Sequence, residues 1–164
     1  VLRYGGEIHA HLLLVESLKL GVIGEYIYSV QLSGDKRGFT LPFSPPAALL
    51  LQLKYAPEKA GFIHSPYLSA DLKMAAAQKR IVPPEDPTPG YLNLDLLAGG
   101  KVRAGDQEIG ISLQVRNLFN NKYYNHTSYY RLIGIPEPGR NFVIHVSIPF
   151  EALHNKGRDE RRNK

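Results

Sequence analysis

The stretch Asn141-Phe142-Val143-Ile144-His145-Val146-Ser147-Ile148-Pro149-Phe150 sets the pattern from which the rest of the sequence can be interpreted. Its even positions are apolar throughout, whereas Asn141, His145 and Ser147 fall on the odd positions. Because side chains alternate between the two faces of a β-strand, a period of two residues predicts a strand with one apolar and one polar face.

Six further segments repeat this two-residue period, so the chain is predicted to be all-β. The fold expected from this period is an antiparallel meander of about seven strands. Apolar residues are expected at even positions in most strands and at odd positions in the strand 109–117. The six segments are 6–14, 18–32, 47–55, 68–76, 91–96 and 109–117.

The connections between these segments alternate in length. Short turns are expected near Glu16, near Pro57 and across 101–107, whereas the loops 33–46, 81–90 and 119–140 are longer, and the first two are rich in proline. Short turns on one side and long loops on the other are typical of outer-membrane barrels. The alternative is a soluble antiparallel β module that binds a ligand, because one face packed on a core gives the same alternation.

The composition of the chain argues against several classes of protein. The 164 residues contain no cysteine, and no apolar run approaches the roughly 20 residues of a helical membrane span. The net charge of +5 does not indicate nucleic-acid binding, because the basic residues are scattered and gather only in the last dozen positions. No serine, histidine and aspartate signature is present, so the chain is not expected to be an enzyme. The start at Val1, without methionine, is interpreted as that of a fragment.

Three ordered motifs resemble the end of TonB-dependent outer-membrane receptors. They are Val115-Arg116-Asn117-Leu118-Phe119-Asn120-Asn121-Lys122-Tyr123-Tyr124, Gly134-Ile135-Pro136-Glu137-Pro138-Gly139-Arg140-Asn141-Phe142 and Ser147-Ile148-Pro149-Phe150. The strong resemblance covers 109–150. The segments Tyr4-Gly5-Gly6-Glu7 and Leu41-Pro42-Phe43-Ser44-Pro45-Pro46 add weaker support.

The resemblance implies the C-terminal segment, 1–150, of a roughly 22-stranded barrel that encloses a plug in the bacterial outer membrane. Such receptors bind and import a scarce nutrient, such as an iron chelate, haem or cobalamin, with energy received from TonB through an N-terminal region absent here. The expected partners are outer-membrane lipid and lipopolysaccharide, the small nutrient ligand and the barrel-assembly machinery. No cofactor and no nucleic acid are expected. The charged tail 151–164 is expected to be disordered.

Physical roles can be suggested for several motif residues. The side chains of Asn117, Asn120 and Asn121 can satisfy backbone groups where the strand ladder ends. Gly139 can supply a positive φ where the loop enters the last strand. Arg116 and Arg140 would bring guanidinium groups to the barrel rim or wall, where a carboxylate or a phosphate could pair with them, although solvated charges are an equal alternative.

Candidate ligand-binding residues lie in the tyrosine-rich loop, where aromatic and cationic groups could close around a cargo. The alternative is an aromatic belt at the membrane interface. The ligand-binding candidates are His126, Tyr129, Tyr130 and Arg131, and the expected assembly signal is Phe142, Ile144, Val146, Ile148 and Phe150.

Other polar residues are assigned no function. His9 and His11 share a strand face and could grip a metal, but lumen-lining side chains are the preferred interpretation, so no metal site is predicted. Glu85 and Asp86 are interpreted as solvated loop charges.

Overall fold

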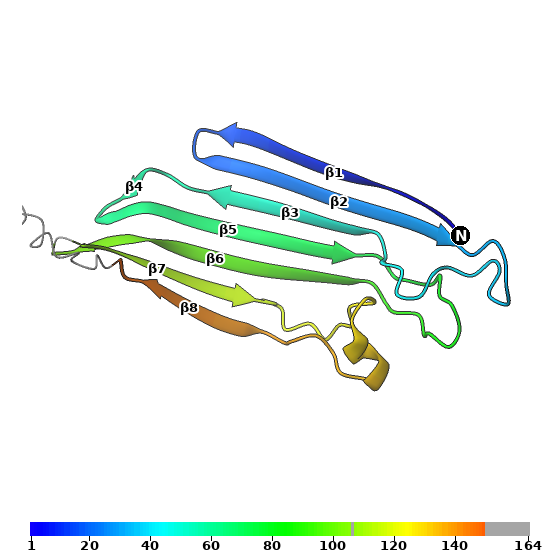
Figure 1. The fold of residues 1–164 in the computed structure, drawn as a ribbon. Coiled ribbons are helices and arrows are strands. Elements are labelled where there is room, and N and C mark those ends of the chain that lie inside the picture. The colour runs from blue at the N-terminus through cyan, green and yellow to red at the C-terminus, as the bar shows by residue number, and fades with distance from the viewer. Residues whose placement is uncertain (106, 150–164) are drawn as a thin grey trace, which may run out of the picture.

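The computed structural model describes residues 1–105 and 107–149, and it confirms the predicted all-β antiparallel meander (Figure 1). Seven long strands pair in the order β1-β2-β3-β5-β6-β7-β8, and the two-residue strand β4 pairs with β5. One 3-10 helix, η1 (Tyr129–Ile133), lies between β7 and β8. The strands are β1 (Leu2–Val15), β2 (Leu18–Val30), β3 (Ala48–Tyr55), β4 (Lys59–Ala60), β5 (Ile63–Ala75), β6 (Tyr91–Ala104), β7 (Gln107–Arg116) and β8 (Asn141–Ser147).

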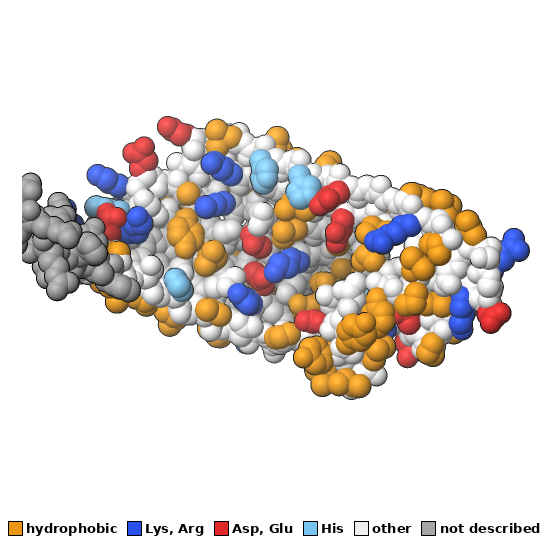
Figure 2. Space-filling model, viewed as in Figure 1, with side chains coloured by type: hydrophobic (Ala, Val, Ile, Leu, Met, Phe, Trp, Pro, Cys, Tyr) orange, Lys and Arg blue, Asp and Glu red, His pale blue; other side chains and the backbone are white. Residues whose placement is uncertain are grey.

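The strand register gathers the polar residues on one face of the sheet. Directly paired residues share a face, so the pairing of Gln52 with Asp71, and of Asp71 with Asp95, continues one polar row from β3 to β6. Figure 2 views this face, over which charged side chains and histidines are scattered. The apolar residues occupy even positions in most strands and odd positions in β7, as predicted, but also odd positions in β3.

The sheet is a single layer, and no other element in the described part of the chain covers its apolar face. Among the described residues, Val82 is the one hydrophobic side chain classed as buried, and it lies in a loop. Ile8, Leu68 and Ile144 on the apolar face are exposed by 59%, 52% and 73%. No helix among the described residues is long and apolar enough to cross a membrane.

The connections differ in length at the two ends of the sheet. Figure 1 shows the turns after β1, β3 and β6 at one end and the three long connections, together with the N-terminus, at the other. The long connections are 31–47, 76–90 and 117–140. The predicted alternation of short and long connections is therefore confirmed.

Two connections of the structure differ from the prediction. β5 begins at Ile63 because β4 pairs with its first residues, so the connection near Pro57 is a small hairpin and not a simple turn. β6 continues to Ala104 and β7 begins at Gln107, so the turn between them is shorter than the predicted turn 101–107.

The last strand is shorter than predicted. β8 ends at Ser147, and Pro149, which lacks a backbone N–H, follows two residues later. Of the expected assembly signal, Phe142, Ile144 and Val146 lie in β8 with exposed side chains, and Ile148 lies just beyond it. Phe150 and the tail 151–164 lie outside the described residues, so those predictions stay untested.

Tyrosines do not all lie on the apolar face. The register places Tyr26, Tyr28 and Tyr55 there. Tyr67 is paired with Gly99 in the polar row. It lies under the ammonium group of Lys54, whose nitrogen is 5.6 Å from the ring centroid.

Candidate functional site

The stem of the longest loop is fixed by Asn117, the first residue after β7. Its φ of 50° turns the chain out of the sheet, in the left-handed region that asparagine tolerates. Its amide nitrogen donates to the carbonyl oxygens of Asn121 (2.9 Å) and Pro138 (3.1 Å), and its Oδ1 accepts from the backbone N–H of Asn121 (2.9 Å). One buried side chain thereby joins both ends of the loop stem.

A carboxylate on the polar face holds this stem to the sheet. Asp95 of β6 accepts the backbone N–H of Asn117 (2.8 Å) and the ammonium group of Lys73 (2.7 Å). The side chain of Asp95 is 7% exposed, whereas that of Lys73 is 49% exposed. The buried carboxylate is therefore compensated by one backbone donor and one cation that reaches it from solvent.

Asn120 closes the stem on the side of β8. Its φ is 55°, and its Oδ1 accepts the backbone N–H of Arg140 at 2.9 Å. A Cβ at position 139 would lie 2.8 Å from this oxygen, which explains the glycine there. Gly139 is not among the residues with positive φ, so the predicted reason for this glycine is wrong. The predicted role of the asparagines as backbone partners is confirmed.

Beyond the stem, the loop is locked to its neighbour by Arg131. The guanidinium group of Arg131 donates to Glu85 Oε1 (3.0 Å), to the carbonyl oxygen of His126 (2.6 Å) and to the carbonyl oxygen of Asp86 (3.3 Å). The side chains of Arg131 and Glu85 are 4% and 8% exposed. Since a buried charge without a partner is costly, this ion pair couples 76–90 to 117–140.

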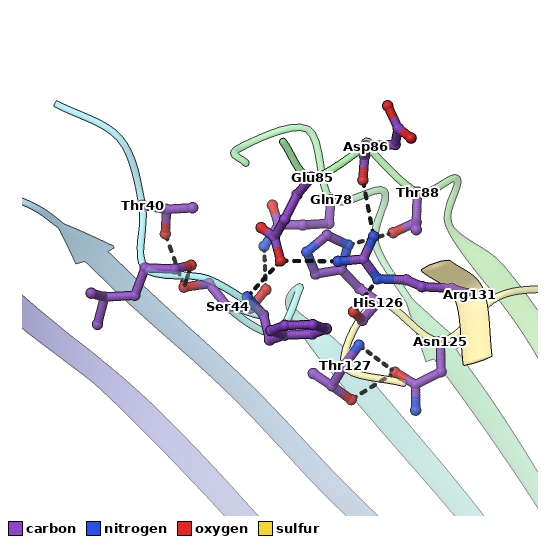
Figure 3. Close-up of polar contacts among 12 residues, drawn as sticks. Thr40, Ser44, Gln78, Glu85, Asp86, Thr88, Asn125, His126, Thr127 and Arg131 are labelled. Carbon is purple, nitrogen blue, oxygen red and sulfur yellow. Dashed lines mark hydrogen bonds and ion pairs between the residues drawn. The ribbon is translucent and has the colours of Figure 1, made fainter. Parts of the chain in front are cut away.

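The third loop joins the lock through Phe43. Its backbone N–H donates to Glu85 Oε1 at 2.8 Å, and its ring lies 4.6 Å from that of Tyr129 between centroids. The guanidinium carbon of Arg131 lies 5.3 Å from the Phe43 ring centroid. Figure 3 shows Ser44, Glu85 and Arg131, one from each of the three long connections, close together. We call Phe43, Glu85, His126 and Arg131 the loop lock.

His126 is the most buried member of the loop lock. Its side chain contacts Thr88 through Nδ1 and Oγ1, 3.0 Å apart, and the residue is 1% exposed. Burial lowers the pKa of His126 from its usual value, and the charge of Arg131 lowers it further, with a smaller opposing effect of Glu85. His126 is therefore favoured in its neutral form inside the lock.

The four residues predicted to bind a ligand thus fall into two groups. His126 and Arg131 are buried and hold the loops together. Tyr129 and Tyr130 are 73% and 65% exposed on η1, which also exposes Leu132 and Ile133. A groove of about 390 Å³ lies beside this helix, lined by Tyr124, Leu132 and three prolines of the loop 76–90. Flat aromatic and proline surfaces of this kind can hold an apolar or ring-bearing ligand.

Sequence reasoning missed the partner of Arg131. Glu85 was expected to be a solvated charge, but the structure buries it in the ion pair. The two residues are 46 positions apart, and no motif spacing connects them. A positive φ at Phe43, a bulky residue, is likewise invisible in the sequence pattern.

The described residues offer little to a metal ion. No group of three or more histidine and acidic side chains is placed to hold one within 1–105 and 107–149. His9 contacts Glu7, its neighbour on the polar face, instead of sharing a ligand with His11.

These features define a class: a single-layer antiparallel wall whose long loops are tied together at one end. No family model matches the chain, and no curated protein matches it. Among solved structures, the copper transporter OprC matches with a TM-score of 0.70 and 23% sequence identity. The match covers 88% of this chain and 23% of that chain, so this chain spans about a quarter of the transporter's length.

Proposed function

We propose that the chain is part of the barrel wall of a TonB-dependent type of outer-membrane receptor that imports a small nutrient. The observation that carries the proposal is the exposed apolar face, which runs across all seven long strands and is not covered by any other described residues. In water such a surface would drive aggregation, whereas in a bilayer it faces hydrocarbon. A soluble β module would pack this face on a core.

The fold comparison supports the same proposal. A match to about a quarter of a copper transporter fits a chain that supplies one sector of a larger barrel. The remaining wall, a plug and the contact with TonB would then lie in other parts of the receptor. The long loops would face the outside of the cell and the short turns the periplasm.

Cargo recognition is proposed for the exposed part of the tyrosine-rich loop. Tyr129 and Tyr130 present their rings to solvent, next to the groove at Tyr124. His126 and Arg131 would support them by holding η1 in place. Metal complexes, including iron chelates, haem, cobalamin and copper complexes, are the cargo class that the resemblance and the transporter together favour.

Membrane topology tests this function. In cells that produce the receptor containing this chain, single cysteines at Ala104 and Lys122 would be labelled with a reagent that cannot cross the outer membrane. Both side chains are exposed, at opposite ends of the wall. We expect labelling at position 122 alone, together with recovery of the protein in the outer-membrane fraction. Labelling at position 104 on intact cells, or recovery as a soluble protein, would contradict the proposal.

A further inference from the structure

The polar face carries a hollow far from the loop lock. It has a volume of about 600 Å³ and lies toward the short-turn end of the sheet. Side chains from five strands of the wall line it, among them Lys54, Tyr67, Lys101, Ser112 and His145.

Two glycines shape the polar face at this hollow, Gly99 beneath the Tyr67 ring and Gly110 in its lining. Tyr67, Gly99, Ser112 and His145 stand in one row across β5, β6, β7 and β8. A Cβ at Gly99 would lie 2.6 Å from the Tyr67 hydroxyl oxygen, so the phenol ring can lie across the sheet only because position 99 has no side chain. In the next row, Gly110 leaves an open place between Lys101 and Ser147.

The charges around the hollow are not balanced within the described residues. Lys19 and Lys54 are directly paired across β2 and β3, and neither makes an ion pair in the described part of the chain. Like charges in such a pair destabilise a sheet. Of the nearby carboxylates, Glu108 already contacts His64 (3.2 Å) and Lys101 (3.4 Å). Glu58 also lines the hollow, and it makes no ion pair within the described residues.

We propose that this hollow binds a small anion with carboxylate or phosphate groups. The ammonium group of Lys54 supplies charge, the hydroxyl groups of Tyr67, Ser112 and Ser147 can donate hydrogen bonds, and His145 can donate through its ring. A bound anion would also offset the repulsion between Lys19 and Lys54. The site is at the opposite end of the wall from the loops, and it does not depend on the proposed transport function.

The test is isothermal titration calorimetry of the receptor that contains this chain, purified in detergent micelles, with inorganic phosphate and with tricarballylate as probes. We expect saturable binding of at least one probe at one site per chain. Lys54→Gln should weaken binding about tenfold, because it removes a charged hydrogen-bond donor. Lys36→Gln is the matched control, since it removes the same charge from the distant loop 31–47 and should change affinity less than twofold.

A second variant separates binding from folding. Tyr67→Phe keeps the ring over Gly99 and removes only the hydroxyl group, so the circular dichroism spectrum should be unchanged while binding weakens about threefold. Equal affinity of wild-type chain and Lys54→Gln would overturn the proposal. So would the absence of saturable binding of both probes.

Discussion

Replacing Arg131 with methionine should open the loop lock, because methionine keeps most of the side-chain volume but removes all three guanidinium contacts. The change leaves the Glu85 carboxylate buried with the Phe43 N–H as its remaining donor. Breaking a buried ion pair by removing one partner costs about 3–5 kcal/mol. Because one donor to Glu85 remains, we expect a loss near the lower limit, about 3 kcal/mol, in the free energy that holds the loops closed.

Hydrogen exchange measured by mass spectrometry reports this loss directly. A decrease of about 3 kcal/mol corresponds to roughly a hundredfold faster exchange of the Phe43 amide and of peptides from 76–90. Arg140→Met is the matched control, since the exposed Arg140 guanidinium makes one 3.4 Å contact with the Leu118 carbonyl oxygen. If Arg131→Met leaves exchange at Phe43 within twofold of wild type, the ion pair does not hold the three loops together.

Three further outcomes are expected. Asn117→Gly should be more stable than Asn117→Ala by about 1 kcal/mol in urea unfolding. Both variants lose the side-chain hydrogen bonds, but only alanine is strained at a φ of 50°. Equal stabilities of the two variants would exclude this strain. Burial lowers the pKa of His126, so the closed loops should be stable above about pH 6.5 and lose stability as the pH falls through the lowered pKa. Hydrogen exchange of the loops, corrected for the pH dependence of intrinsic exchange rates, should show this loss of stability. His126→Gln should remove the pH dependence. A pH dependence that is unchanged in that variant would come from another titrating group. The double variant Tyr129→Ala and Tyr130→Ala should reduce cargo uptake while the receptor remains at normal levels in the outer membrane. Unchanged uptake would favour the alternative, in which the tyrosines form an aromatic belt at the membrane interface.

The strands could be predicted from the sequence because each has a two-residue period that any register must respect. Alternation alone places Ile144 and Val146 on the apolar face and Asp71 and Asp95 on the polar face. The stem residue Asn117 could also be assigned a backbone-binding role, because short amide side chains act locally.

The loop lock could not be predicted in the same way. Glu85 and Arg131 meet only because β5, β6, β7 and β8 place two separate loops at the same end of the sheet. A charged residue in a proline-rich loop is normally exposed. Glu85 is buried because Arg131, 46 residues away, pairs with it. The hairpin at β4 was missed for a related reason, since Ser65 adopts a φ of 46° that no local pattern required.

The asparagine stem has a consequence for how this protein can evolve. The contacts of Asn117 and Asn120 fix where the loop leaves and re-enters the wall, and they involve no residue of η1. In the helix itself the Arg131 side chain is buried in the loop lock, whereas Tyr130 and Ile133 are exposed. Substitutions at Tyr130 or Ile133 can therefore change the proposed recognition surface while the strands beneath keep their register.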